Sequence, residues 1–246
     1  MTARMDGFSP QLSLKDVALD ELKQQTNTLR IGEIRLSMNP LGVLQGNIKP
    51  NKITIVNTGI SIKRFADGHV SIVGFSDEKN DSSSGDFSWL LEDGLFEVID
   101  SQIVWKDDMR DEEDVYLDNA QIVFQNIHQE HRLKIAASLP SRIGKDFVLS
   151  LVVKGDVLST TDWHAEGYLQ TQKIQLSEVL KRLDIDEFEI ERGVGDVEIW
   201  SQWGAAELSR VRGKVHIDEA RMLQKQTNLT VKNVSGLFDW EKLAHG

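Results

Sequence analysis

The sequence lacks cysteine entirely, contains only four prolines among its 246 residues, and has no long apolar run. Without cysteine the chain has no disulfides, no thiolate metal ligands and no cysteine nucleophile, although this absence selects no cellular compartment. No stretch reaches the roughly 18 apolar residues that a membrane helix needs. Residues 1–16 also lack the apolar core of a signal peptide, so we expect no segment of this chain to enter or cross a membrane.

Positive charge is scarce as well, because 28 Lys and Arg residues face 39 Asp and Glu residues, which gives a formal net charge of -11. An acidic surface repels phosphate backbones and anionic membrane surfaces, so we expect no nucleic acid among the partners. The hydrophobic content of 40% can build a packed structure. The length fits one domain or two small ones, and we treat residues 1–246 as a single β-rich segment.

Apolar residues recur at every second position along most of the chain, which is typical of strands with one buried face. In residues 52–64, two isoleucines precede positions 57–59 and two follow them, which predicts two strands joined by a turn at 57–59. Residues 95–100 and 101–108 likewise predict a pair of strands, and Asp67 with Gly68 predicts a tight turn. Strand-sized segments recur about every eight to twelve residues, which is the spacing of an all-β protein.

Helical patterns are few and short. Residues 15–25, 40–46 and 177–185 predict short helices, and the polar residues 76–86 predict a surface loop. So few helices cannot cover a sheet of many strands that are each apolar on one face. The sheet must therefore close on itself as a sandwich or barrel, pack on other parts of a larger protein, or curl into a gutter whose apolar lining meets an apolar ligand.

An ordered series of motifs runs along the chain. A helical turn, a strand, a further strand pair and an Asp-Gly turn occupy residues 40–72, and a Trp-Leu-Leu motif stands at 89–91. A strand, an Asp-Ser turn at 100–101 and a strand ending in Trp-Lys-Asp at 105–107 follow. The later motifs are His-Arg-Leu at 131–133, Leu-Pro at 139–140, Gly144, Trp163, Gly-Tyr-Leu at 167–169, Gly-Val-Gly at 193–195 and Glu-Ile-Trp at 198–200. This series, over residues 30–240, resembles the AsmA-like family of large periplasmic proteins, of the YhdP type.

The resemblance implies an extended, curved antiparallel sheet that forms an open, taco-like groove, with two or three short helices. It also implies a protein that is anchored in the inner membrane of Gram-negative bacteria and moves phospholipids across the periplasm to the outer membrane. This chain lacks the anchor and is far shorter than full-length members. We therefore expect a periplasmic segment whose partners are phospholipid acyl chains and the remaining parts of a larger AsmA-like protein.

Alternating apolar residues in the middle of the chain are the candidates for the groove lining. An acyl chain gains roughly 0.8 kcal/mol for each CH₂ kept out of water, and this contact has no preferred direction. Binding of this kind involves no chemical reaction, so we expect no catalytic group and no cofactor. In the alternative interpretation, the same residues fill the closed core of a non-catalytic β-sandwich that binds carbohydrate or protein. The candidates are Ile122, Phe124, Leu133, Ile135, Phe147, Leu149 and Leu151.

The remaining clusters of reactive side chains have weak signatures. Residues 107–114 hold six carboxylates without the glycine and the spacing of an EF-hand loop, so they fit a solvated hairpin tip better than a divalent-cation site. His128 and His131 have the wrong spacing and context for a zinc motif. The six tryptophans fit large anchors, with a sugar-stacking face or a glycosidase as the alternative. We expect neither an enzyme nor a metal site.

Overall fold

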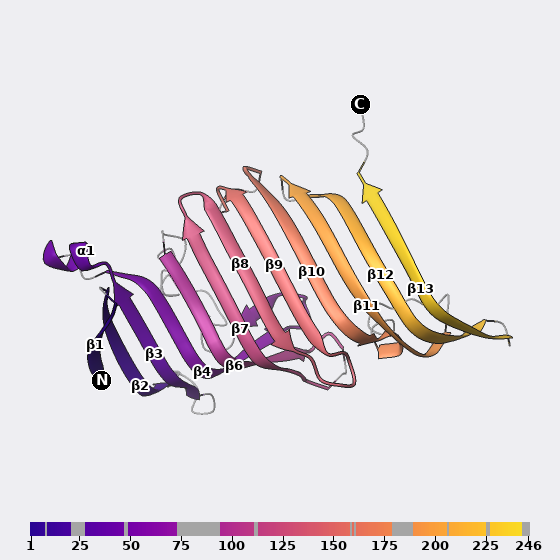
Figure 1. Cartoon of the computed structure of the whole chain (residues 1–246), viewed down its shortest axis with the longest axis horizontal. Coiled ribbons are helices and arrows are strands. Elements are labelled where there is room, and N and C mark those ends of the chain that lie inside the picture. Colours follow the sequence, from indigo (N-terminus) through magenta and orange to yellow (C-terminus); the bar gives the residue numbers. More distant parts are fainter. Residues whose placement is uncertain are drawn as a thin grey trace. The chain divides into compact units, whose positions relative to one another are not determined.

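The computed structural model describes residues 1–7, 9–20, 28–46, 49–72, 94–110, 113–157, 159, 161–178, 189–205, 207–224 and 227–242. These residues form a mainly β structure in which the strands belong to one mostly antiparallel open sheet (Figure 1). The mainly β expectation is confirmed, and the sandwich alternative is wrong because the described strands do not divide into two packed sheets. The strands are β1 (Thr2–Asp6), β2 (Ser9–Asp20), β3 (Thr28–Met38), β4 (Pro50–Arg64), β5 (Val70–Ile72), β6 (Gly94–Asp107), β7 (Val115–Ile127), β8 (Glu130–Ser138), β9 (Asp146–Gly155), β10 (Trp163–Gln175), β11 (Glu189–Gly204), β12 (Glu207–Gln224) and β13 (Thr227–Glu241).

The chain divides into two compact units, residues 1–131 and 132–246, with the division inside β8. In the N-terminal unit the strand order is β1-β2-β3-β4-β6-β7, and β5 pairs with β4. Within this order β4 and β6 are parallel, whereas the other registered pairs are antiparallel. In the C-terminal unit, β9 to β13 form a meander in which each strand pairs antiparallel with the next.

A row of five residues crosses five strands of the N-terminal unit. Four of them have left-handed backbone and the fifth is a glycine. Asp16, Asn57, Asp100 and Asn119 all have a φ between 52° and 56°, and Asx residues tolerate this region better than other side chains. Strand pairing places Asp16 and Asn57 beside Gly32 and Asp100 beside Asn57, while Asn119 lies in the register shift between β6 and β7. A Cβ on Gly32 would lie 3.1 Å from the Asn57 Cβ, which explains the glycine. We call these five residues the left-handed row.

At the left-handed row, the spacing between side chains of the same face changes from two residues to three. The same face of each strand is therefore buried before and after the row. Ile55 and Thr58 of β4 are both buried although they are three positions apart, and Val98 and Ser101 of β6 repeat this spacing. In a regular strand, residues three apart point to opposite faces. Pairing between β2, β3, β4 and β6 stays one-to-one across the row, so these strands share the irregular level, and the side chains beyond it return to the original face.

The left-handed row corrects two sequence-based expectations. The turn predicted at 57–59 and the strand pair predicted from 95–100 and 101–108 are wrong, because β4 and β6 each run through these positions without reversing. The prediction failed because Asn and Asp at positive φ are typical of turns, whereas here they occur within continuous strands. The helix predicted at 15–25 is also wrong over its described part, which is the end of β2.

Other local predictions agree with the structure. The helix expected at 40–46 is α1 (Pro40–Leu44), in which the Asn39 side chain accepts a hydrogen bond from the Leu41 N–H at 3.0 Å. The turn at Gly68 is present, with a φ of 89°. Residues 176–178 have helical backbone, so the first two positions of the helix expected at 177–185 agree with the structure. Its remaining positions, 179–185, lie outside the described residues. The loop expected at 76–86 also lies outside them.

The C-terminal unit has its own left-handed positions. Lys173 of β10 has a φ of 53° and lies within the register shift between β10 and β11, and Asn233 of β13 has a φ of 51°. The Lys173 N–H donates to the Asp196 carboxylate at 2.8 Å, and its ammonium donates to Asp218 at 2.7 Å. Side chains of neighbouring strands therefore satisfy the backbone and the charge at this irregular point.

The face of the N-terminal unit opposite Leu14, Ile34 and Ile55 is a ladder of polar contacts, in which Ser13 and Thr54 are buried. The Glu33 carboxylate accepts hydrogen bonds from the Ser13 hydroxyl at 2.6 Å and the Arg35 guanidinium at 2.7 Å. The Arg35 hydrogen bond, followed by that from Ser13, lowers the pKa of Glu33 to about 2. Thr54 donates in the same way to Glu97 at 3.1 Å.

Replacing Asn57 with valine should lower the free energy of unfolding by about 1–2 kcal/mol, because a β-branched side chain is strained at positive φ. Asn57→Gly should retain the wild-type stability. The matched control is Asn51→Val, which puts the same side chain at an exposed position of β4 outside the left-handed row. Urea denaturation measures all three variants, and equal losses for the two valine variants would contradict the structural role of the row.

The depressed pKa of Glu33 predicts a pH dependence of stability. Its folded value of about 2 lies below the ordinary 4.5, so the stabilisation by ionised Glu33 is present above pH 4.5 and is lost as the pH falls toward 2. Glu33→Gln should flatten this part of the curve of unfolding free energy against pH. In Ser13→Ala, the Glu33 carboxyl should titrate at a higher pH by NMR. A Glu33 that titrates near 4.5 in the wild type would rule out this network.

Candidate functional site

One face of the N-terminal unit is apolar across β2, β3, β4, β6 and β7, because strand pairing aligns the alternating positions. Ile55 and Val98 are buried at its centre together with Ile31, and Phe96 and Ile122 pack against this cluster while remaining half-buried. We call the two aligned rows the N-terminal apolar face. They consist of Leu14, Ile34, Ile55, Val98 and Ile122, and of Leu12, Leu36, Ile53, Phe96 and Phe124.

Next to the left-handed row the same face holds three smaller side chains beside Ile31. Thr58, Ser101 and Ala120 are aligned with Ile31 and all four are buried. The Ser101 hydroxyl donates to the Ile99 carbonyl at 2.8 Å, and the Thr58 hydroxyl donates to the Arg30 carbonyl at 3.2 Å. These bonds reduce the cost of burying the two hydroxyl groups among apolar neighbours.

The C-terminal unit has a comparable face on β9 to β13. Nearly all of its large apolar side chains are half-buried, and only Phe238 and Trp240 of β13 are more exposed. A side chain on Gly213 would overlap the Phe238 ring, so this glycine makes room for the phenylalanine. We call the following three rows the C-terminal apolar face. They are Phe147, Thr171, Val197, Val215 and Gly236; Leu149, Leu169, Ile199, Gly213 and Phe238; and Leu151, Gly167, Ser201, Val211 and Trp240.

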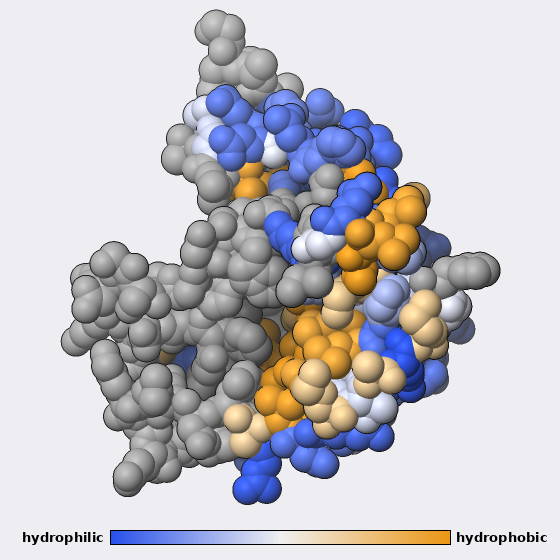
Figure 2. Space-filling model, turned by 90° about the vertical axis from the view of Figure 1, so that its left-hand side faces the viewer, coloured by the Kyte–Doolittle hydropathy of each residue, from blue (hydrophilic) through white to orange (hydrophobic). Residues whose placement is uncertain are grey.

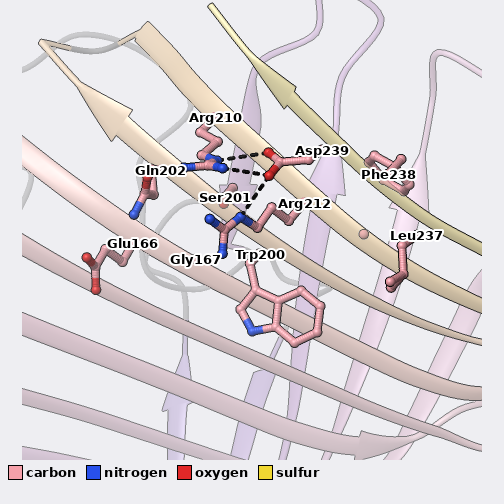
Figure 3. Close-up of a pocket in the computed structure, with 11 residues that line it drawn as sticks. Glu166, Gly167, Trp200, Ser201, Gln202, Arg210, Arg212, Leu237, Phe238 and Asp239 are labelled. Carbon is pink, nitrogen blue, oxygen red and sulfur yellow. Dashed lines mark hydrogen bonds and ion pairs between the residues drawn. The ribbon is translucent and has the colours of Figure 1, made fainter.

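The other face of the C-terminal unit carries charge. Figure 3 shows Arg210 and Arg212 directed at Asp239, with donor–acceptor distances of 2.6 to 3.2 Å. The Arg210 hydrogen bonds hold the pKa of Asp239 below its usual range. These residues and Trp200 line a cavity of about 640 Å³. Because Asp239 engages both arginines, the arrangement is a structural ion-pair network on a sheet surface rather than a poised acid or base.

Near this network, Tyr168 and Trp200 lie side by side with ring centroids 5.4 Å apart. Burial, followed by the charge of Glu198, raises the pKa of the Tyr168 hydroxyl. Trp200 and Trp203 lie on opposite faces of the sheet, because Trp203 pairs with Ala165 and hydrogen bonds to Ser201. The described tryptophans therefore do not form one sugar-stacking face, and Trp89 lies outside the described residues.

The histidine and acidic clusters have local structural partners. The buried His131 ring lies 2.6 Å from the Asn126 side-chain oxygen, across the β7–β8 hairpin. Asp107 accepts two hydrogen bonds from Arg64, and this hydrogen bonding lowers the pKa of the Asp107 carboxyl group. Within the part of the chain that the structure describes, no group of three or more His, Asp or Glu side chains could hold a metal ion.

The seven candidate groove residues lie in three consecutive strands, and all are half-buried. Ile122 and Phe124 lie in β7, on the N-terminal apolar face beside Val98 and Phe96. Leu133 and Ile135 lie in β8. Phe147, Leu149 and Leu151 lie in β9, on the C-terminal apolar face, where Leu149 is opposite Leu169.

The sequence analysis missed most members of the two faces, including Phe96, Ile53, Leu169 and Ile199. Their period-two alternation is the same signal that identified the seven candidates. The missing information was the register, which decides which alternating residues of different strands lie side by side.

Within each unit, the described residues supply no second sheet over the apolar face of that unit. All described strands belong to one sheet, and the described helix α1 has no buried residue. Figure 2 shows apolar atoms gathered in a band bordered by hydrophilic atoms, on the side of the molecule that carries β1 and β2. Single-sided sheets of this kind normally bury their apolar face against another element.

The chain matches a known protein family. Among the described residues, no helix is long and apolar enough to cross a membrane. No curated protein and no solved structure matches the chain. A family model described as "YhdP protein" matches residues 1–246, which confirms the resemblance drawn from the ordered motifs. The chain therefore belongs to the YhdP family.

Proposed function

We propose that this chain binds phospholipid acyl chains along its apolar faces, as a segment of an AsmA-like protein that conducts lipid between the inner and outer membranes. One observation carries the proposal. The apolar face of each unit is largely half-buried, and within each unit the described strands form one sheet, with no second sheet of the same unit over that face. An acyl chain has the chemistry to complete this burial, because it is apolar, flexible and as long as several strand spacings.

The energetics favour a ligand that slides. Each Å² of apolar surface removed from water stabilises the complex by about 25 cal/mol, and each acyl CH₂ contributes about 0.8 kcal/mol. These contacts have no preferred direction, so a shift of the acyl chain along the face exchanges equivalent contacts. In the C-terminal unit the rows at Phe147, Leu149 and Leu151 repeat along β9 and provide such equivalent positions.

The turn between β8 and β9 supports the assignment of the two β8 candidates. The Leu139 N–H donates to the Lys145 carbonyl at 2.8 Å, which sets the register of the two strands at their ends. Continued along both strands, this register puts Leu133 opposite Leu151 and Ile135 opposite Leu149. Under the proposal, both β8 residues therefore extend the C-terminal apolar face.

The proposed setting is the periplasm, with the remaining parts of a larger AsmA-like protein as the protein partners. The faces opposite the apolar ones are rich in ion pairs such as Arg212 with Asp239 and Arg35 with Glu33, which suit contact with water. The proposed function requires no catalytic residue, cofactor or metal. The net charge of -11 argues against a nucleic-acid ligand.

Phe124→Asp and Leu149→Asp should reduce the phospholipid that co-purifies with the chain by about tenfold or more, because each places a charge on an apolar face. The matched controls are Val123→Asp and Ser150→Asp, since these neighbours are also half-buried but point to the opposite face. Lipid extraction and native mass spectrometry of the purified protein measure the bound phospholipid.

Circular dichroism and urea denaturation accompany these measurements. Folded Asp variants that lose lipid, beside controls that retain it, support the proposal. If Phe124→Asp and Leu149→Asp unfold the chain, these positions are ordinary core and the proposal fails. A wild-type chain that carries no phospholipid, or equal lipid loss in all four variants, also counts against it.

A further inference from the structure

The hydrophilic face of the C-terminal unit exposes one large aromatic ring. Trp200 of β11 is 41% exposed, although strand pairing places it between Tyr168 of β10 and Arg212 of β12. An exposed indole ring on a sheet surface offers a flat apolar platform to a ligand. Because β11 has a paired strand on each side, the exposure of Trp200 belongs to the face of the sheet and not to an edge.

Two rows of polar side chains border the Trp200 ring, one on each side of it along the strands. Each row has one member on β10, one on β11 and one on β12, and pairing aligns the three. The rows are Glu166, Gln202 and Arg210, and Gln170, Glu198 and Lys214. Residues two apart in a strand point to the same side, so both rows share the face of Trp200.

The cavity at this ring is lined by hydrogen-bonding groups that have no partner. Its volume is about 640 Å³, and Figure 3 shows Glu166, Gln202 and Trp200 around it. Within the described ranges, the Glu166 carboxylate, the Gln202 side-chain amide and the Trp200 indole N–H form no hydrogen bond with another residue. A cavity of this size with a few convergent polar groups is the usual form of a small-molecule site.

One wall of the cavity is held in place by ion pairs. Asp239 accepts two hydrogen bonds from Arg210, at 2.8 and 2.6 Å, and one from the Arg212 Nε at 3.2 Å. Among the described residues Arg212 contacts Asp239 through Nε alone, so the two terminal nitrogens of its guanidinium are available to a ligand. Tyr168 lies beside Trp200 with ring centroids 5.4 Å apart. These contacts preorganise the cavity, which lowers the entropy lost on binding.

The charges around the ring balance. Three carboxylates and three cations surround it, although the whole chain has a net charge of -11. They are Glu166, Glu198 and Asp239, and Arg210, Arg212 and Lys214. A strongly charged ligand would meet no surplus of opposite charge here. An acyl chain would bury these polar groups without hydrogen bonds, which costs free energy. The cavity therefore favours a ligand that is polar and uncharged.

Hydroxyl groups match the available groups of the cavity. A hydroxyl can donate to the Glu166 carboxylate and accept from the Arg212 guanidinium, and the Gln202 amide offers both a donor and an acceptor. The CH groups on one face of a sugar ring pack against an indole platform, while the hydroxyls at the edge of the sugar ring reach the flanking side chains. Both halves of this chemistry are present within one cavity.

We propose that this cavity binds a neutral saccharide, with one sugar ring stacked on Trp200 and its hydroxyl groups hydrogen bonded to Glu166, Gln202 and Arg212. We call these four residues the saccharide site. One platform serves one sugar ring, so the site needs no second tryptophan on the same face. Saccharide binding here is independent of the proposed lipid binding, because the two use opposite faces of the sheet.

The first test is the binding of the whole chain to an array of neutral and anionic glycans, detected through an affinity tag. The wild-type chain should bind neutral glycans. Trp200→Ala should lower this binding by about tenfold or more, because the platform is lost. Trp203→Ala is the matched control, since Trp203 is 36% exposed on the opposite face and its loss should leave glycan binding unchanged.

The second test measures the affinity for the strongest neutral glycan of the array by isothermal titration calorimetry. Gln202→Leu should weaken binding about fivefold or more, because a sugar hydroxyl loses its partner. The matched control Gln172→Leu changes an exposed glutamine of β10 outside the saccharide site and should have no effect. Trp200→Tyr should keep part of the affinity, because it retains an aromatic ring. Raising the salt concentration from 0.05 to 0.5 M should change the affinity by less than about twofold, because the ligand is uncharged.

Neutral-glycan binding that Trp200→Ala and Gln202→Leu weaken and that both controls retain supports the saccharide site. A wild-type chain that binds no glycan of the array overturns it. Equal losses in Trp200→Ala and Trp203→Ala also overturn it and assign the binding to another surface. An affinity that falls tenfold or more with added salt overturns the assignment to a neutral ligand. Circular dichroism checks the folding of each variant, and if Trp200→Ala is unfolded, Trp200→Tyr and Gln202→Leu decide.

Discussion

The structure depends on one constraint. Each strand must keep its apolar side chains on a single face, even where a left-handed residue interrupts the regular strand backbone. In the N-terminal unit the left-handed row meets this constraint at aligned positions of β2, β3, β4, β6 and β7. With regular strand backbone at Asn57, simple alternation would turn Ile60 to the polar side. Because the irregular positions are aligned, Ile31, Ile55 and Val98 still meet in one buried cluster.

The same constraint explains the distribution of small and polar residues. Thr58, Ser101 and Ala120 occupy buried positions next to the row, in line with the buried Ile31. The two hydroxyl groups are hydrogen bonded locally, so the face remains apolar toward its surroundings. In the C-terminal unit the irregular residue is Lys173, whose backbone N–H donates to Asp196 and whose ammonium group donates to Asp218.

Alternation in the sequence predicts the strands and the one-sided character of the sheet, because both follow from a period of two. It does not distinguish an irregular residue within a strand from a turn, so the pattern around Asn57 and Asp100 predicts reversals. Residues 15–20 are predicted as part of a helix for a related reason, since a three-residue step at Asp16 imitates helical spacing. The composition of each apolar face depends on register, which places Phe124 beside Phe96 and which no local pattern contains.

The two faces of this sheet differ in what they can bind. The apolar faces offer contacts without direction, so they suit a flexible chain of CH₂ groups and place little demand on its position. The opposite faces carry ion pairs such as Arg212 with Asp239, whose directional contacts suit water. The proposed lipid binding therefore uses one side of the sheet and leaves the other side hydrated.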